Sequence, residues 1–302
     1  MEIQFFNHHT KKVETEKVYG DQLIEWLYKS SSGQMLSHFL CKAPLSKLYG
    51  AFQNTGLSAK KIESFIKNYQ IDLNTFLPEE GRDASSPYSN FNQFFIRRFK
   101  PGKRPFSEAS NELGAFAEAR YFGYKSVSDE ETYPVKGHFL SARELIANAK
   151  WQNTFADGPL LLARLCPVDY HRFHYPDNGV ILDEFRVPGQ YHSVNPLALK
   201  SKPDIFITNE RHVTILETEN FGKLAYVEVG AICVGKIVQS NPLSKGFKFK
   251  KGDEKGYFLF GGSTVIVLGE KGKWTPQSEI LENTKKGMET YFHLGTTVAS
   301  IG

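Results

Sequence analysis

Residues 258–268 read Phe-Leu-Phe-Gly-Gly-Ser-Thr-Val-Ile-Val-Leu, and this stretch decides how the rest of the chain is interpreted. The apolar residues on both sides are typical of a buried strand, whereas Gly261 and Gly262 add nothing to its packing. Because glycine is costly within a strand, the pair indicates a bent backbone or the close approach of another group. Ser263 follows directly, so its hydroxyl can reach the carbonyl before it. The stretch therefore predicts a buried strand that carries a reactive serine.

Composition sets the broad class of the protein. The 302 residues suffice for one large domain or two small ones, and 40% hydrophobic, 14% aromatic and 23% charged residues are typical of a globular protein. The net charge of +4 and a pI near 8.7 are mildly basic, which does not favour nucleic acid as a partner. An anionic membrane surface remains open as a partner, and so does the plainer interpretation of ordinary surface lysines.

Cysteine usage and hydropathy bear on the compartment. The three cysteines are far apart in sequence and odd in number, which predicts a reducing compartment rather than a disulfide framework. The first 17 residues are polar and lack the apolar core of a signal peptide. Since the sequence holds no run of about 18 apolar residues, we expect any membrane contact to be peripheral.

The first part of the chain carries helical periodicity. Apolar residues recur at helical spacing over residues 21–69, and Ser58 is the expected N-cap of a helix that buries Ile62, Phe65 and Ile66. Lysines are interleaved with these apolar residues, so the helices could lie in a membrane interface or simply pack on the core of the protein. We take residues 1–89 as an N-terminal helical, membrane-associating segment, which ends in a loop over residues 77–89.

The remainder, residues 90–302, is expected to form a β-rich, mainly antiparallel catalytic domain. Residues 204–208, 213–217 and 223–229 have the composition and turn signals of antiparallel strands. No regular alternation of strand and helix favours a doubly wound parallel sheet. The fold class is therefore α+β, with helices first and β structure after.

A basic stretch opens this second part. Residues 91–105 join an aromatic segment to five positive charges, among them Arg97 and Arg98. These two arginines are candidates for binding a phosphate or phospholipid headgroup. The stretch is equally consistent with a short helix that is followed by basic residues exposed to solvent.

The densest cluster of reactive side chains is Asp169-Tyr170-His171-Arg172-Phe173-His174. Two imidazoles three residues apart could donate two nitrogens to a metal, although no further ligands stand at a characteristic spacing. They could instead serve as a general base and a general acid, with Asp169 orienting one of the rings.

At this point the chain resembles the phosphatidylserine decarboxylase proenzymes of the prokaryotic type. The resemblance rests on the segment 251–265 with its Gly-Gly-Ser-Thr variant of the Leu-Gly-Ser-Thr site and on the cluster 169–176. Residues 91–105, 226–235 and 287–290 also match family motifs, so the resemblance runs from about residue 90 to 295. It implies a decarboxylase that acts in phospholipid biosynthesis.

The resemblance also implies roles for the residues. Ser263 would attack the carbonyl of Gly262, the amide would become an ester, and elimination would leave chains 1–262 and 263–302 with a covalent pyruvoyl group in place of Ser263. His174 matches the family's base for this step. His171 matches the residue that returns a proton after phosphatidylserine loses CO₂ to become phosphatidylethanolamine, and Asp169 matches a family acidic position.

One position departs from the family pattern. The orienting aspartate of the family falls at Glu118, which keeps the carboxylate but adds a methylene, and Ala119 stands where glycine is usual. We expect Glu118 to complete a relay with His174 and Ser263, and the alternative is an ion pair between Glu118 and Arg120 or another cation.

These implications fix the expected partners and leave two other functions open. The substrate would be phosphatidylserine in a membrane, reached by a peripheral protein on the cytoplasmic face. The two chains of the precursor would stay together, a homodimer is allowed, and no metal is expected. The alternatives are a non-cleaving lipid-binding homologue and, less favoured, a histidine-based metal hydrolase.

Overall fold

The computed structural model describes residues 3–16, 50–127, 141–194, 198–199, 204–231, 236–261 and 263–301. The helices expected between residues 21 and 49, the cysteines Cys41 and Cys233, and the glycine before the reactive serine, Gly262, lie outside the described residues.

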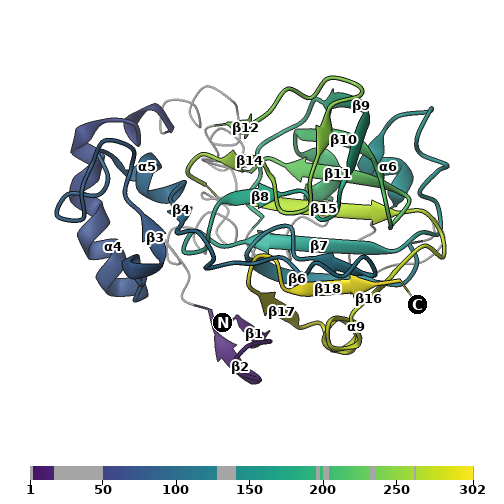
Figure 1. The fold of residues 1–302 in the computed structure, drawn as a ribbon, viewed down its shortest axis with the longest axis horizontal. Helices are drawn as coiled ribbons and strands as arrows, with labels where there is room; N and C mark the ends of the chain where they lie inside the picture. Colours follow the sequence, from purple (N-terminus) through teal and green to yellow (C-terminus); the bar gives the residue numbers. More distant parts are fainter. Residues whose placement is uncertain are drawn as a thin grey trace, which may run out of the picture.

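A ten-stranded sheet forms the centre of the described fold (Figure 1). Its strands are, in spatial order, β13 (Lys248–Phe249), β9 (Gly179–Val187), β10 (Arg211–Thr218), β11 (Lys223–Val229), β15 (Ser263–Gly269), β7 (Leu160–Leu165), β6 (Ala119–Tyr124), β17 (Glu289–Phe292), β1 (Gln4–Asn7) and β2 (Lys12–Thr15). Every pair of neighbours is antiparallel except β1 and β17, which run parallel. The prediction of a β-rich, mainly antiparallel domain is confirmed.

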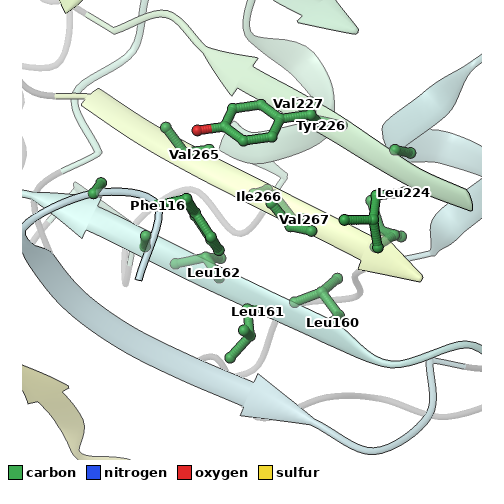
Figure 2. Close-up of a cluster of buried hydrophobic side chains, with 14 of the residues drawn as sticks. Phe116, Leu160, Leu161, Leu162, Leu224, Tyr226, Val227, Val265, Ile266 and Val267 are labelled. Atoms are coloured by element: carbon green, nitrogen blue, oxygen red, sulfur yellow. The ribbon is translucent and has the colours of Figure 1, made fainter. Parts of the chain in front are cut away.

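The middle of this sheet is apolar on both faces. Figure 2 shows side chains of β7, β11 and β15 gathered in one cluster, with Phe116 beside them. Leu162 and Ile266, which are paired across β7 and β15, are at most 1% exposed. A substitution such as Leu162→Ala would cost roughly 2–5 kcal/mol, because the close-packed surroundings cannot fill the cavity. Burial on both faces explains why these strands read as continuous apolar runs.

A smaller sheet lies beside the central one, and two segments of the chain connect the two sheets. It contains β12 (Ile237–Gln239), β14 (Glu254–Phe258) and β8 (Arg172–His174), and Figure 1 draws it at one end of β7 and β15. The chain that leaves β14 enters β15, and the chain that leaves β7 enters β8. Because β14 pairs with β8 and β15 pairs with β7, both connections cross from one sheet to the other at the same corner.

The glycine bend lies at this crossing. Gly261 has a φ of 146°, a conformation that residues with a Cβ rarely adopt. The bend predicted from the sequence is therefore confirmed at Gly261, although it separates two strands of different sheets rather than interrupting one strand. We call this region, residues 166–171 together with 259–261 and 263, the sheet corner.

Helices cover the periphery. An aromatic cluster at the left of Figure 1, beyond the small sheet as seen from the large one, is built from α4 (Ile62–Tyr69) and α5 (Phe91–Phe95), which follow the 3-10 helix Gly56–Lys61. Against the large sheet lie α6 (Ala142–Ile146) and α9 (Ser278–Lys285), and α8 (Ile205–Thr208) contacts α6. The remaining short elements are the 3-10 helix Leu73–Thr75, β3 (Phe76–Leu77) with β4 (Arg98–Phe99), and the sheet of β16 (Thr275–Pro276), β18 (Thr297–Ser300) and β5 (Glu112–Gly114).

Two local predictions were wrong. Residues 204–208 do not form a strand, because the amides of Ile207 and Thr208 both bond to the carbonyl of Asp204 and close the short helix α8. Ser58 does not cap a helix. It is buried inside the 3-10 helix, where its hydroxyl donates to the carbonyl of Gln53 and accepts from the amide of Phe91. The strand predictions for residues 213–217 and 223–229 are confirmed in β10 and β11.

The first residues of the chain belong to the central sheet. The hairpin of β1 and β2 extends the sheet beyond β17, so the segment expected to be helical begins with a strand pair. The division at residue 89 stays a prediction. In the part of the chain that the structure describes, no helix has the length and apolar character needed to cross a membrane.

Candidate functional site at the sheet corner

Ser263 is the first residue of β15 and is completely buried. It is paired with Leu165, the last residue of β7, so the serine lies where both strands leave the central sheet. On the other side of the bend, the amide of Phe260 donates to the side chain of Asn92 at 2.9 Å, which fixes the incoming chain. Phe260 and Ser263 are thus each held in place, the first by Asn92 and the second by its pairing with Leu165.

His171 is the histidine that contacts Ser263. Its Nδ1 lies 3.3 Å from the Ser263 Oγ, and its Nε2 lies 2.8 Å from the carbonyl oxygen of Cys166. The ring is fully buried and stacks on Phe95 of α5, with 3.7 Å between the ring centroids. A carbonyl can only accept, so Nε2 carries the proton and Nδ1 presents its lone pair to the serine hydroxyl.

The surroundings keep this imidazole neutral. Burial lowers the pKa of His171 to about 3, against the opposing hydrogen bond to Cys166. At neutral pH the ring is therefore an acceptor for the Ser263 proton. This is the arrangement that a general base requires.

A tight turn holds the His171 ring in this orientation. The carbonyl of Cys166 accepts from the amide of Asp169 as well as from His171, and the carboxylate of Asp169 accepts from the amide of Cys166 at 2.7 Å. Asp169 also pairs with Arg120 at 2.6 Å. In this structure Asp169 therefore contacts the turn that positions His171 rather than an imidazole ring.

His174 has different partners. Its Nδ1 lies 2.8 Å from the carbonyl oxygen of Gly252, and its Nε2 lies 3.2 Å from the hydroxyl of Tyr170. Burial lowers the pKa of His174 as well. Both ring nitrogens are thus engaged with groups other than Ser263.

The carboxylate of Glu118 is held by a cation. Arg104 binds both of its oxygens, and the Glu118 Oε1 lies 2.9 Å from the Arg104 Nη2. The hydroxyl of Tyr291 and the amide of Leu294 donate to the same carboxylate. The backbone brings this segment to His174, because the amide of His174 donates to the carbonyl of Phe116. The geometry matches the alternative of an ion pair, and the relay from Glu118 to His174 stays a prediction.

The two candidate headgroup arginines differ in exposure. Arg97 is 3% exposed and donates to the backbone carbonyls of Phe94, Val168 and Asp169. Its guanidinium thereby supports the turn that holds His171. The side chain of Arg98 is 61% exposed and lies 3.7 Å from Glu254, so it remains accessible from outside.

Sequence reasoning missed a buried ionic cluster next to this turn. It consists of the acidic residues Glu16, Asp169 and Glu289 and the basic residues Arg120 and Arg164. The signal was present, since Arg120 and Arg164 each stand inside apolar strands, and a charge in such a place requires a buried partner. The two acidic partners of Arg164, Glu16 and Glu289, lie more than 100 residues away from it in sequence, so spacing could not identify them.

Across the ranges that the structure describes, no group of three or more His, Cys, Asp or Glu side chains is arranged to hold a metal ion. The interpretation of His171 and His174 as a metal site gains no support from these ranges.

Comparisons with known proteins agree with the motifs. The family model described as phosphatidylserine decarboxylase matches residues 91–299. The phosphatidylserine decarboxylase proenzymes of Clostridium botulinum (strain Alaska E43 / Type E3) and Clostridium perfringens (strain ATCC 13124) are each 40% identical over 299 residues, which is 99% of both chains. The proenzyme of the same name from Clostridium tetani is 38% identical over 296 residues, 98% of this chain and 97% of its own.

Proposed function

The chain belongs to the phosphatidylserine decarboxylase family, and from this membership we propose that two successive reactions occur at its sheet corner. The protein is a self-processing decarboxylase that converts phosphatidylserine to phosphatidylethanolamine. The first reaction cleaves the precursor between Gly262 and Ser263, giving chains 1–262 and 263–302. It leaves a pyruvoyl group in place of Ser263. The second reaction is the decarboxylation itself.

The observation that carries this proposal is the hydrogen bond from Ser263 Oγ to the neutral His171 Nδ1. His171 takes the hydroxyl proton while Oγ attacks the carbonyl carbon of Gly262. The bond from that carbon to the Ser263 nitrogen breaks, the nitrogen takes the proton, and an ester remains. The Ser263 Cα then gives its proton to a base, for which His171 is the candidate, while the bond between Cβ and Oγ breaks and Gly262 leaves as a carboxylate. Cβ takes up a proton and becomes a methyl group, and water replaces the Ser263 nitrogen, which departs as ammonia.

Burial makes His171 a weak base, so its contribution to the transfer is the position of its Nδ1 beside the Ser263 Oγ. An imidazolium is unfavourable where burial lowers the pKa to about 3, so the ring holds the proton only between its release from Oγ and its transfer to nitrogen. The neutral imidazole and the fixed turn provide the orientation that such a transfer needs.

The residues present fit a pyruvoyl group at position 263. The position is fully buried and its neighbour His171 is uncharged, so a carbonyl group at this position would be shielded from water. When formed, the group supplies a carbonyl that accepts the electrons released with CO₂. His171 borders position 263 and is therefore the candidate to return a proton to the substrate's α-carbon.

The roles of the two histidines remain to be separated by experiment. The family resemblance assigns the base for cleavage to His174, whereas the contact with Ser263 is made by His171. We favour His171 for both proton transfers, because one ring next to position 263 can take the Oγ proton in the first reaction and, in the second, take a proton from the substrate's ammonium group and return it to the α-carbon. His174, Glu118 and Asp169 are then groups that support the corner.

For the substrate, we propose phosphatidylserine in a membrane, reached by a peripheral protein on the cytoplasmic face. Arg98 is the candidate for the headgroup phosphate, since its side chain is exposed, while the buried Arg97 acts on the turn. The two chains stay associated after cleavage because β15 lies between β11 and β7 in the central sheet. A homodimer is compatible with this arrangement.

The intact mass of the purified protein tests the proposal. We expect two chains that correspond to residues 1–262 and 263–302, the smaller one blocked at its N-terminus by a carbonyl that borohydride reduces. Ser263→Ala should abolish both cleavage and decarboxylation. A single uncleaved chain without a reducible carbonyl would exclude the enzyme and favour the alternative of a non-cleaving, lipid-binding homologue.

A further inference from the structure

The N-terminal hairpin places an acidic side chain inside the catalytic domain. Glu16 follows β2, and its amide donates to the carbonyl of Ile3 at 2.8 Å, which closes the hairpin. Its side chain is only 2% exposed. Burying an isolated carboxylate is costly, so its position requires partners.

Those partners are two arginines on neighbouring strands. Arg120 of β6 and Arg164 of β7 are directly paired across the sheet, and like charges in that arrangement repel. The Glu16 Oε2 lies 3.0 Å from the Arg120 Nε and 2.6 Å from the Arg164 Nη2. Burial alone would raise the pKa of Glu16, but the two arginines lower it to about 2. The bridging group is therefore an ionised carboxylate. Glu289 binds the far side of Arg164 at 2.6 and 2.7 Å.

The bridge continues to the active serine. Arg120 lies 2.6 Å from the carboxylate of Asp169, and that carboxylate accepts from the amide of Cys166. The carbonyl of Cys166 accepts from the Nε2 of His171, whose Nδ1 faces Ser263. Each contact in this series is between groups that are at least nine-tenths buried.

We propose that Glu16 is a positioning residue for self-cleavage: by bridging Arg120 and Arg164, it fixes the guanidinium that holds the turn carrying His171. The inference rests on the proposed function of Ser263 and His171. It makes the N-terminal hairpin part of the processing machinery, since residues 3–16 supply a group that the catalytic domain from residue 90 onward lacks.

Substitution of Glu16 tests the inference in the full-length precursor. The rate measured is the first-order appearance of the two chains after the precursor is synthesised in a cell-free system. We expect Glu16→Gln to slow cleavage about tenfold or more, because Arg120 then keeps an anion on one side only. Glu14→Gln is the matched control. It lies on the same hairpin, but its carboxylate bonds only to Asn7 and Thr10 among the contacts described, so cleavage should proceed at the wild-type rate.

A double-mutant comparison separates positioning from general weakening. If Glu16 acts through Arg120 and Asp169, then adding Glu16→Gln to Asp169→Asn should slow cleavage less than threefold further. A full additional tenfold loss in the double variant would overturn the inference, because it would show that Glu16 acts independently of Asp169.

A second readout does not depend on cleavage. In the Ser263→Ala precursor, ¹⁵N NMR of His171 should show a single tautomer with the proton on Nε2, and Glu16→Gln should yield a mixture of the two tautomers. A lower melting temperature with an unchanged tautomer would overturn the inference.

If Glu16→Gln does not fold, the charge-preserving Glu16→Asp takes its place. Its side chain is one methylene shorter and cannot reach both arginines, so we expect a folded precursor with slower cleavage. A wild-type rate in Glu16→Asp would contradict the inference. Failure of the proposed function is distinguishable, because the unsubstituted precursor would then not cleave at all.

Discussion

Two histidines three residues apart lie in contrasting surroundings. His171 stacks on an aromatic ring, contacts Ser263, and has Arg97 as the charged group that acts on it. His174 lies toward a charged side of the site, where Glu254, Arg172 and Asp253 act on it, and its ring nitrogens contact Gly252 and Tyr170.

The difference shows how one short motif can supply two kinds of histidine. His171, at the sheet corner, lies beside Ser263 of β15 and stacks on Phe95 of α5. A residue three positions further, at the end of β8, borders the ion pairs on the outside of the small sheet. The following predictions test whether this contrast in surroundings is also a contrast in function.

The largest expected effect separates the two rings directly. We expect His171→Gln to slow self-cleavage about a hundredfold or more, the usual contribution of a positioned base, and His174→Gln to slow it less than about tenfold. The measurement is the first-order rate of chain appearance in each full-length precursor. The reverse order would assign the base to His174, as the family resemblance does.

The second prediction concerns pH, measured in the uncleaved Ser263→Ala precursor. An unfolded histidine takes up a proton near pH 6.5, whereas the folded His171 does so only near pH 3. The unfolded state therefore binds more protons between these values, and the free energy of unfolding contributed by His171 falls as pH falls, by about 1.4 kcal/mol per pH unit.

Urea unfolding at pH 6.5, 5.5 and 4.5 checks this slope. With His171→Gln added, unfolding should take up about one proton fewer, so the free energy of unfolding should depend less steeply on pH. An unchanged slope would mean that His171 is accessible to water and that the contrast with His174 is smaller than the structure indicates.

The third prediction concerns the ion pair between Glu118 and Arg104. Glu118→Gln should lower the free energy of unfolding by about 1–2 kcal/mol, because Arg104 loses an ionised hydrogen-bond partner, and should slow cleavage less than tenfold. Arg104→Gln should have a similar effect, and the double variant should be little worse than either single one. A hundredfold slower cleavage in Glu118→Gln would instead support its relay to His174.

The smallest effect on stability is expected at Arg98. Its side chain is largely exposed and its nearest carboxylate, that of Glu254, is 3.7 Å away, so Arg98→Gln should change the free energy of unfolding by less than about 0.5 kcal/mol. We expect cleavage at the wild-type rate and weaker association of the mature protein with phosphatidylserine vesicles. Unchanged association would remove Arg98 as the headgroup residue.

The sequence was sufficient to predict the features that depend on local pattern. The strand over residues 223–229 matches β11, because its turn and composition are both local signals, and the Gly261 bend follows from glycine alone. Residues 204–208 look like a strand by composition, but the carbonyl of Asp204 accepts hydrogen bonds from two amides and a hydroxyl, which close a helical turn. The periodicity of five residues cannot reveal these bonds.

Features that depend on distant pairing could not be predicted. The parallel contact between β1 and β17 joins residues more than 280 positions apart, and the position of Glu16 between two arginines follows from that contact. The motif gave Ser263, His171 and His174 as a group. Which ring meets the serine depends on the crossing of two chains between sheets, and no spacing in the sequence encodes that crossing.

Because the proposed cleavage site lies at the sheet corner, cleavage also changes the molecularity of unfolding. Before cleavage, the strands on both sides of the bend belong to one chain, so unfolding is a unimolecular process. After the proposed cleavage, β15 would be part of a separate chain of 40 residues, 263–302, that is inserted between β11 and β7. Unfolding of the mature protein then releases two molecules, so the midpoint of its unfolding transition should depend on protein concentration. Refolding by dilution should restore the two-chain enzyme less readily than the single-chain precursor.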